Sequence, residues 1–171
     1  GISKNDKIVI YDNSDVVSSC RCWFNFIYFG HDPRLVHVLN GGLQKWINEK
    51  KDITNNETIV QISKYQTYEK KELVKDKKSI DQNINEQNFQ LIDARSEKRF
   101  LGLQPEPRKG MRSGHIKNSK NIPFQLLINN DRTFKKINEL INIFKEKQIS
   151  PNIEMAFTCG SGITACILGL A

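Results

Sequence analysis

The chain has 171 residues, of which 38% are hydrophobic and 26% charged, and this length can bury a core as one domain or as parts of two. Its formal net charge is +7, but five of the lysines lie in residues 69–78, where no aromatic residue is interleaved. That composition is typical of a solvated connector, so we expect no nucleic-acid partner. No apolar run is long enough to span a bilayer, so we expect a soluble chain with no membrane partner.

The four cysteines, Cys20, Cys22, Cys159 and Cys166, do not make a disulfide framework in a chain of this length. Cys20 and Cys22 lie too close along one predicted helix to form a standard zinc pair, and no histidine has a matching spacing. We therefore expect no metal site and a reducing compartment. No signal peptide is visible at Gly1, so the expected location is cytoplasmic, with the mitochondrion as the alternative because the true N-terminus is not visible.

The first part of the chain alternates between strand and helix patterns. Residues 7–12 are an apolar run ending in aspartate, which is typical of a buried parallel strand. Residues 16–29 predict a mostly buried helix closed by Gly30. Residues 35–39 predict the next strand and residues 43–47 a short helix. This order predicts a parallel sheet with right-handed crossovers.

The pattern weakens between residues 50 and 88, where we place a domain boundary. Residues 58–62 could form one more strand, and the rest of this stretch is polar and rich in lysine. A second run of elements follows it. We expect a strand at 89–93, a short helix at 94–100, a long loop at 102–114, an extended segment at 116–124 and an amphipathic helix at 133–146.

The stretch with the clearest chemistry is an apolar strand that ends in Cys159, a loop of small residues and a helical run from residue 165. Gly160 and Gly162 permit backbone conformations in which successive amide groups point inward, where they join the unpaired donors of the first helical turn. Such a cradle lowers the pKa of a thiol, and the thiolate is the nucleophile. We predict that Cys159 is a nucleophile at the carboxyl edge of a parallel sheet; the alternative is a small buried hydrophobe at a strand end.

An internal repeat relates the two halves. Residues 8–14 (Ile-Val-Ile-Tyr-Asp-Asn-Ser) align with residues 155–161 (Met-Ala-Phe-Thr-Cys-Gly-Ser), so that Asp12 occupies the place of Cys159. The alignment predicts a duplicated unit in which one copy lacks the nucleophile. A chance match over so few residues is the alternative.

Together these pieces resemble the tandem rhodanese-type sulfurtransferases, in particular the 3-mercaptopyruvate sulfurtransferase branch. The resemblance is carried by residues 159–164 (Cys-Gly-Ser-Gly-Ile-Thr), 93–96 (Asp-Ala-Arg-Ser), 99–108 (Arg-Phe-Leu-Gly-Leu-Gln-Pro-Glu-Pro-Arg), 112–116 (Arg-Ser-Gly-His-Ile), 121–124 (Asn-Ile-Pro-Phe) and 40–46 (Asn-Gly-Gly-Leu-Gln-Lys-Trp). It implies an α/β fold of two rhodanese-like units, each with a parallel sheet flanked by helices.

The resemblance also implies a domain division. Residues 1–50 would be the C-terminal part of an inactive rhodanese-like domain, residues 51–87 a linker and residues 88–171 a catalytic domain whose C-terminal end is missing. Both units are expected to be truncated. The histidine and aspartate that help to activate the nucleophile in this family would then lie upstream of Gly1, and we expect His31 and His37 to be structural.

The family's site residues carry over by motif. Arg99 and Arg108 resemble the substrate-carboxylate ligands, since a guanidinium binds a carboxylate through two parallel hydrogen bonds; the alternative is a pair of exposed loop arginines. The hydroxyls of Ser161 and Thr164 could bind the thiolate or persulfide, or cap the following helix. We expect the catalytic residues to be Cys159 and Ser161, and the substrate-binding residues to be Arg99, Arg108, Gly160, Gly162 and Thr164.

Arg95, His115 and Arg112 are three further charged or titratable residues in these motifs. Arg95 is expected to be a structural ion-pair partner of Asp93, two residues before it. His115 is expected to be structural. Arg112 could add positive charge at the mouth of the site.

The resemblance implies a sulfurtransferase that moves sulfur from 3-mercaptopyruvate through a cysteine persulfide to a thiol acceptor such as thioredoxin, or to cyanide, releasing pyruvate without any cofactor. The alternatives are a thiosulfate sulfurtransferase (rhodanese) and a non-catalytic interaction module, which would have lost the cysteine. Neutral Gly160 and Ser161 favour mercaptopyruvate over dianionic thiosulfate. A phosphatase of this fold needs arginine six residues after the cysteine, where this chain has Ala165.

Overall fold

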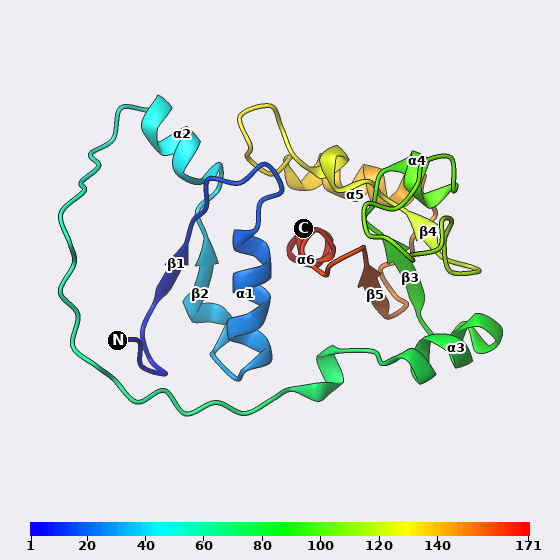
Figure 1. Cartoon of the computed structure of the whole chain (residues 1–171), viewed down its shortest axis with the longest axis horizontal. Coiled ribbons are helices and arrows are strands. Elements are labelled where there is room, and N and C mark those ends of the chain that lie inside the picture. The colour runs from blue at the N-terminus through cyan, green and yellow to red at the C-terminus, as the bar shows by residue number, and fades with distance from the viewer. The chain divides into compact units, whose positions relative to one another are not determined.

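The computed structural model describes residues 1–171 and divides them into two units (Figure 1). The first unit comprises Gly1–Val74 and Asp131–Thr133, and the second comprises Lys75–Asn130 and Phe134–Ala171. Each unit contains a parallel sheet with helices, as the sequence predicts. None of the helices is long and apolar enough to cross a membrane.

The first unit is built on a two-stranded parallel sheet. Its elements are β1 (Ile8–Ile10), α1 (Ser19–Tyr28), a 3₁₀ turn η1 (Pro33–Leu35), β2 (Val36–Val38), α2 (Gly42–Asn48) and a second 3₁₀ turn η2 (Lys71–Leu73). The register pairs Ile8 with Val36 and Ile10 with Val38. Helix α1 packs against both strands and buries Ile27, which is the strand–helix–strand crossover expected for a parallel pair.

The second unit has a three-stranded parallel sheet in the order β4-β3-β5. Its elements are α3 (Lys77–Glu86), β3 (Gln90–Asp93), α4 (Glu97–Phe100), β4 (Lys120–Asn121), a 3₁₀ turn η3 (Phe124–Leu127), α5 (Ile137–Glu146), β5 (Met155–Thr158) and α6 (Ala165–Leu170). Seven buried residues form its core: Ile92, Ala94, Ile122, Leu127, Leu140, Ile149 and Leu168. Central strand β3 is buried over most of its length, as expected for a parallel strand covered on both faces.

Two helices begin about three residues later than the apolar pattern indicates, for the same physical reason. The aspartate that follows β1 and the one that ends β3 both accept backbone hydrogen bonds. Asp12 Oδ1 accepts from the Ser14 amide at 2.8 Å, and Asp93 Oδ1 accepts from the Arg95 amide at 2.9 Å. After the Asp93 turn, α4 begins at Glu97. In the first unit Asp12 also accepts from the Ser19 amide, and Val17 has φ +46°, so the chain becomes helical only at Ser19.

The prediction of a strand at residues 58–62 is wrong. The structure has neither helix nor strand between residues 51 and 70, and Figure 1 shows this segment as a continuous tube. Ile59 and Ile62 are 96% and 99% exposed. An apolar run becomes a strand only where a neighbouring strand pairs with its backbone and a core covers its side chains, and this segment has neither.

Helix α3 lies in the stretch that the sequence assigned to the linker, but it belongs to the second unit. Asp76 caps it by accepting a hydrogen bond from the Ser79 amide at 2.8 Å. The Asn83 side chain, which is buried, bonds both the amide and the carbonyl of Phe89, at 3.0 and 2.9 Å. Two hydrogen bonds from one amide side chain therefore fix this helix against the start of β3, beside two half-buried isoleucines on the same helix face.

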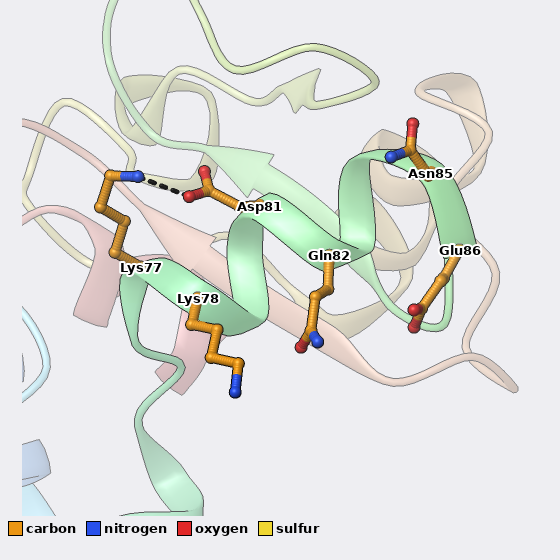
Figure 2. A pocket seen from close by; sticks show the side chains of 6 residues that line it. All are labelled: Lys77, Lys78, Asp81, Gln82, Asn85 and Glu86. Atoms are coloured by element: carbon orange, nitrogen blue, oxygen red, sulfur yellow. Dashed lines mark hydrogen bonds and ion pairs between the residues drawn. The ribbon is translucent and has the colours of Figure 1, made fainter.

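The exposed face of α3 lines a shallow hollow, shown in Figure 2. Its six side chains are polar or charged: Lys77, Lys78, Asp81, Gln82, Asn85 and Glu86. Lys77 and Asp81 form an exposed ion pair one turn apart (Figure 2). None of these residues belongs to the predicted site, and the surface has the character of a solvated helix face.

Candidate active site

Cys159 directly follows β5 at the carboxyl edge of the second sheet. Strand β5 pairs in parallel with β3, and the register places Thr158 beside Asp93. On its other side β3 pairs in parallel with β4, where Asp93 lies beside Asn121. The carboxyl ends of the three strands therefore meet at one edge, where open α/β sheets hold their ligands. The predicted position of Cys159 is confirmed.

The loop after Cys159 folds back so that its backbone amides approach the thiol. The Gly162 amide donates to Cys159 Sγ at 3.0 Å. Gly162 has φ +78°, a left-handed conformation that glycine adopts without the strain a side chain would add. Helix α6 begins at Ala165, so the amides of its first turn also lie near the thiol.

This cradle changes the acidity of Cys159. Partial burial raises the pKa of the Cys159 thiol, but hydrogen bonds from the Thr164 hydroxyl and from the amides of Ala165, Ser161 and Gly162 lower it by more. The net pKa lies below the usual value of 9.0. By contrast, burial alone raises the pKa of Cys22. Cys159 is thus more readily ionised than an ordinary thiol, as a nucleophile requires.

The structure separates the contributions of the predicted loop residues. Gly162 and Ser161 act through their backbone amides, whereas Thr164 acts through its hydroxyl. The Ser161 side chain is exposed, and its hydroxyl makes no hydrogen bond in the structure. The structure thus gives the Ser161 hydroxyl no role of its own, and its predicted catalytic role stays a prediction.

Cys166, to which the sequence pattern assigns no role, supports the loop. It is buried in the first turn of α6, and its thiol donates to the Gly162 carbonyl at 3.1 Å. This bond fixes Gly162, the residue whose amide donates to Cys159. The sequence does contain one indication of this contact, because Cys166 follows Gly162 by four residues, about one helical turn.

Arg99 lies against the cysteine loop. A Cβ atom placed on Gly160 would lie 3.0 Å from Arg99 Nη2, so the absence of a side chain at Gly160 leaves room for the guanidinium. Arg108 is exposed, and its side chain makes no hydrogen bond or ion pair in the structure. The structure thus brings Arg99 to the loop of Cys159, whereas a role for Arg108 stays a prediction.

A buried network of ion pairs surrounds Arg99. Arg95 pairs with Asp93 at 2.6 Å, which confirms its predicted structural role, and with Glu106 at 2.7 Å. Glu106 also pairs with Arg99 at 2.5 Å. Side-chain exposure is 3% for Asp93, 10% for Arg95 and 4% for Glu106. Buried charges persist only when paired, and here the pairing is complete.

Glu106 is the residue that the sequence analysis missed. It lies inside the quoted arginine motif, between Pro105 and Pro107. The available signal was charge: an acidic residue in a loop rich in arginine and lysine is a natural ion-pair partner. Hydrogen bonds from Arg99 lower the pKa of Glu106, against an opposing effect of burial, so the carboxylate is ionised at neutral pH.

The loop that follows α4 is closed at its base. Arg95 Nη2 donates to the Gly114 carbonyl at 2.8 Å. His115 Nδ1 lies 2.7 Å from the Phe100 carbonyl, and the two rings stack at 3.8 Å between centroids. These contacts confirm the structural role predicted for His115. They bring the two ends of the arginine loop together beside the network.

The corresponding loop of the first unit contains a carboxylate where the second has a thiol. Asp12 follows β1, as Cys159 follows β5. Its oxygens accept from the amides of Ser14 and Ser19, each at 2.8 Å. Burial raises the pKa of Asp12, but hydrogen bonds from Ser19 and Ser14 lower it by a larger amount. The pKa therefore lies below the usual value of 3.8. In both loops, backbone amides donate to an acidic side chain at the end of a strand and lower its pKa, which supports the predicted repeat.

Comparison with known proteins identifies the family of the chain. The chain matches the Rhodanese-like domain family over residues 1–49 and 76–171. It is 38% identical to thiosulfate/3-mercaptopyruvate sulfurtransferase 2 of Arabidopsis thaliana over 99% of this chain, 37% to mouse 3-mercaptopyruvate sulfurtransferase over 97%, and 36% to rat thiosulfate sulfurtransferase over 100%. It spans about half the length of these relatives: 55%, 56% and 58%.

Solved structures agree on the fold. The structure superposes on Escherichia coli SseA, described as a 3-mercaptopyruvate sulfotransferase with the rhodanese fold, with a TM-score of 0.82 and 27% identity, covering 99% of this chain and 62% of SseA. It superposes on Tum1 of Saccharomyces cerevisiae with a TM-score of 0.80 and 25% identity, covering 99% of this chain and 61% of Tum1. Sequence motifs, paired α/β units and these matches lead to one conclusion: the chain belongs to the rhodanese family.

Proposed function

We propose that the protein is a sulfurtransferase that takes sulfur from 3-mercaptopyruvate and passes it on through a persulfide on Cys159. The observation that carries this proposal is the Cys159 thiol, whose pKa is lowered by the Gly162 amide and its neighbours at the sheet edge, with Arg99 against the same loop. A nucleophilic thiolate beside a guanidinium suits a donor that has both a sulfur atom and a carboxylate.

In the first half-reaction the Cys159 thiolate attacks the sulfur of 3-mercaptopyruvate. A sulfur–sulfur bond forms, and the carbon–sulfur bond breaks, with its electron pair passing to the carbon that was bound to sulfur. The resulting enolate takes up a proton and leaves as pyruvate. Arg99, with Arg108 as its predicted partner, binds the carboxylate and keto oxygen and stabilises the enolate charge.

In the second half-reaction a thiol acceptor, such as thioredoxin or a small thiol, or cyanide attacks the outer sulfur of the persulfide. That sulfur leaves with the acceptor, and Cys159 is restored as a thiolate. The loop amides that lower the pKa of Cys159 can hold the outer sulfur anion between the two steps. The transferred sulfur itself carries the chemistry, so no organic cofactor takes part. Two separate half-reactions predict ping-pong kinetics.

A second candidate donor is thiosulfate, because relatives of similar identity are named thiosulfate sulfurtransferases. Thiosulfate is a dianion, and the loop positions Gly160 and Ser161 offer it no positive side chain. This composition favours 3-mercaptopyruvate. A purely non-catalytic interaction module is disfavoured, because such a module gains nothing from a thiol whose pKa is lowered.

Mass spectrometry of the complete protein after incubation with 3-mercaptopyruvate alone tests the proposal. One added sulfur atom is expected on the peptide that contains Cys159, together with release of pyruvate. Cys159→Ser should abolish both, whereas the matched change Cys22→Ser, at an exposed cysteine, should leave both unchanged. Pyruvate release by Cys159→Ser at the parent rate would refute the mechanism.

A further inference from the structure

We propose that Glu106 is a positioning residue that acts through Arg99 and sets the preference of the site for singly charged sulfur donors. The inference rests on the proposed function, because it concerns the donor that Arg99 would bind. It comes from the contacts of Glu106, whose carboxylate is buried between two arginines.

The first observation is how Glu106 holds Arg99. Glu106 Oε1 accepts from Arg99 Nε at 3.1 Å, and Oε2 accepts from Nη2 at 2.5 Å. This is the two-bond geometry in which a guanidinium binds a carboxylate. The Nε and Nη2 edge of Arg99 is therefore occupied before any donor arrives. A donor carboxylate meets Arg99 through Nη1, or shares Nη2, so Glu106 decides which edge of the guanidinium faces the donor.

The second observation is the charge of the network. Asp93 and Glu106 each contribute one negative charge, and Arg95 and Arg99 each contribute one positive charge, so the formal sum is zero. The two pairs lie at 2.6 and 2.5 Å, and a third contact joins Arg95 to Glu106 at 2.7 Å. Glu106 thus cancels the charge of Arg99 close to the loop of Cys159.

Charge balance affects the two candidate donors differently. The interaction of a donor with an uncompensated positive charge scales with the charge of the donor. Thiosulfate carries two negative charges, and 3-mercaptopyruvate carries one on its carboxylate. With Glu106 in place, the network offers directed hydrogen bonds but little net attraction, so a dianion gains no advantage over a monoanion. Without the Glu106 charge, the dianion gains more.

The third observation links Glu106 to Arg108. Both lie in the loop whose ends are closed by the Arg95 bond to the Gly114 carbonyl and by the contacts of His115 with Phe100. Within this loop Glu106 is the buried acidic side chain, and Arg108 follows it by two residues in the exposed part. Anchoring Glu106 therefore also restricts where Arg108 can reach.

The test compares Glu106→Gln with Glu97→Gln in the complete protein. Both changes remove one negative charge, but Glu97 is exposed on α4 and is not an ion-pair partner of Arg95 or Arg99. We measure kcat and KM for 3-mercaptopyruvate and for thiosulfate at low and high salt. Glu106→Gln should raise the ratio of kcat/KM for thiosulfate to that for 3-mercaptopyruvate by about tenfold at low salt, and by less at high salt because ions screen the uncompensated charge.

Glu97→Gln should leave this ratio within about twofold of the parent, since exposed charges are strongly screened. A ratio for Glu106→Gln equal to that for Glu97→Gln would overturn the inference. A parent protein that accepts neither donor would instead overturn the proposed function, and the inference with it. The activity of the parent protein with the two donors therefore distinguishes failure of the proposed function from failure of this inference.

Glu106→Asp distinguishes the effect of the charge from the effect of its position. It also tests the positioning role of Glu106 if Glu106→Gln does not fold. Aspartate keeps the charge but is shorter by one methylene group, so it cannot reach both arginines in the same geometry. The donor ratio should stay within about twofold of the parent, while KM for 3-mercaptopyruvate rises severalfold as Arg99 is displaced. An aspartate variant with the KM of the parent would overturn the positioning role.

Discussion

At the scale of single residues, the reactivity of Cys159 depends on a few hydrogen bonds to sulfur. Partial loss of contact with water by itself raises the pKa of a thiol, as it does for Cys22, although that residue is largely exposed. At Cys159 the amides of the loop and the hydroxyl of Thr164 reverse this effect. The acidity of the Cys159 thiol is therefore set by its neighbours in the loop, and its pKa can be changed by replacing one of them.

Thr164→Val tests this directly, because valine keeps the shape of threonine and removes the hydroxyl. The pKa of Cys159 should rise towards its usual value, since one of the bonds that lower it is lost. The rate of alkylation of Cys159 by iodoacetamide at neutral pH should fall by about two- to tenfold, the effect of one hydrogen bond of about 0.5–1.5 kcal/mol. An unchanged pH profile of alkylation would show that the hydroxyl does not act on the thiol.

Arg99→Lys tests the guanidinium. Lysine keeps the charge but cannot form two parallel bonds, either to Glu106 or to a donor carboxylate. We expect kcat/KM for 3-mercaptopyruvate to fall more than tenfold, a loss of at least about 1.4 kcal/mol of transition-state stabilisation. Arg34→Lys is the matched control, because Arg34 makes the same kind of two-bond pair with Asp32 on an exposed surface. Equal effects of the two changes would argue against a role for Arg99 in donor binding.

At the scale of elements, the site depends on how β5 passes into α6. The chain turns sharply at Gly162, whose φ is +78°, and this turn directs its amide to Cys159. The helix that follows is fixed by side chains in the core, among them Ile167 and Leu168, which are 0% and 1% exposed. A buried helix thus holds in place a turn whose backbone conformation glycine adopts without strain.

Gly162→Ala should lower both stability and reactivity. Alanine in a left-handed conformation costs about 1–2 kcal/mol, and any relaxation of the turn moves the amide away from the thiol. We expect a lower unfolding temperature together with slower alkylation of Cys159. In Gly169→Ala the added Cβ would lie 3.7 Å from Phe157, an ordinary contact, and α6 gains helix propensity of about 0.5–1 kcal/mol. The control should therefore be as stable as the parent or more so, and fully reactive.

The contrast between the predicted and observed helices also belongs to this scale. The apolar pattern predicts that helix α5 begins at residue 133. It begins at Ile137, where the amide of Lys136 donates to the Glu139 carboxylate at 3.1 Å. Apolar periodicity located the helix correctly, because its buried face follows the 3.6-residue repeat. It did not locate the first turn, because that depends on a side-chain hydrogen bond at the end of the helix.

At the scale of the whole molecule, each unit has an acidic residue whose ionisation is tied to its fold. In the first unit burial raises the pKa of Asp12 but the bonds from Ser19 and Ser14 lower it below 3.8, and in the second the Arg99 bonds lower the pKa of Glu106 below 4.5. A group whose pKa is lowered by folding stabilises the folded state at a pH above its unfolded pKa. This contribution is lost as the pH falls through that value towards the folded pKa.

We therefore expect both units to lose stability below about pH 5. Two variants, one in each unit, test whether each acidic residue controls the pH dependence of its own unit. Both tryptophans, Trp23 and Trp46, lie in the first unit, so their fluorescence follows its unfolding, while exposure of the buried Cys166 thiol follows the second. Asp12→Asn should flatten the pH dependence of the fluorescence transition only. Glu106→Gln should flatten that of Cys166 exposure only. A single variant that flattened both would show that the units unfold together.

The sequence alone located Cys159, which we propose as the nucleophile, the loop around it and most of the strands and helices, because these depend on neighbouring residues. A short apolar run before Cys159, two glycines after it and a helical pattern beyond are local signals, and the structure bears out the arrangement they predict. The position of Cys159 at the sheet edge followed from the same local pattern.

Only the tertiary structure decided which charged groups surround this loop. Glu106 pairs with Arg95 and Arg99, 11 and 7 residues before it, because the arginine loop closes on itself and buries the carboxylate. Likewise, residues 58–62 have a strand-like sequence but no strand beside them, and α3 is fixed to the start of β3 by the hydrogen bonds of a buried asparagine. Pairing and burial depend on contacts between distant segments, which local sequence patterns do not contain.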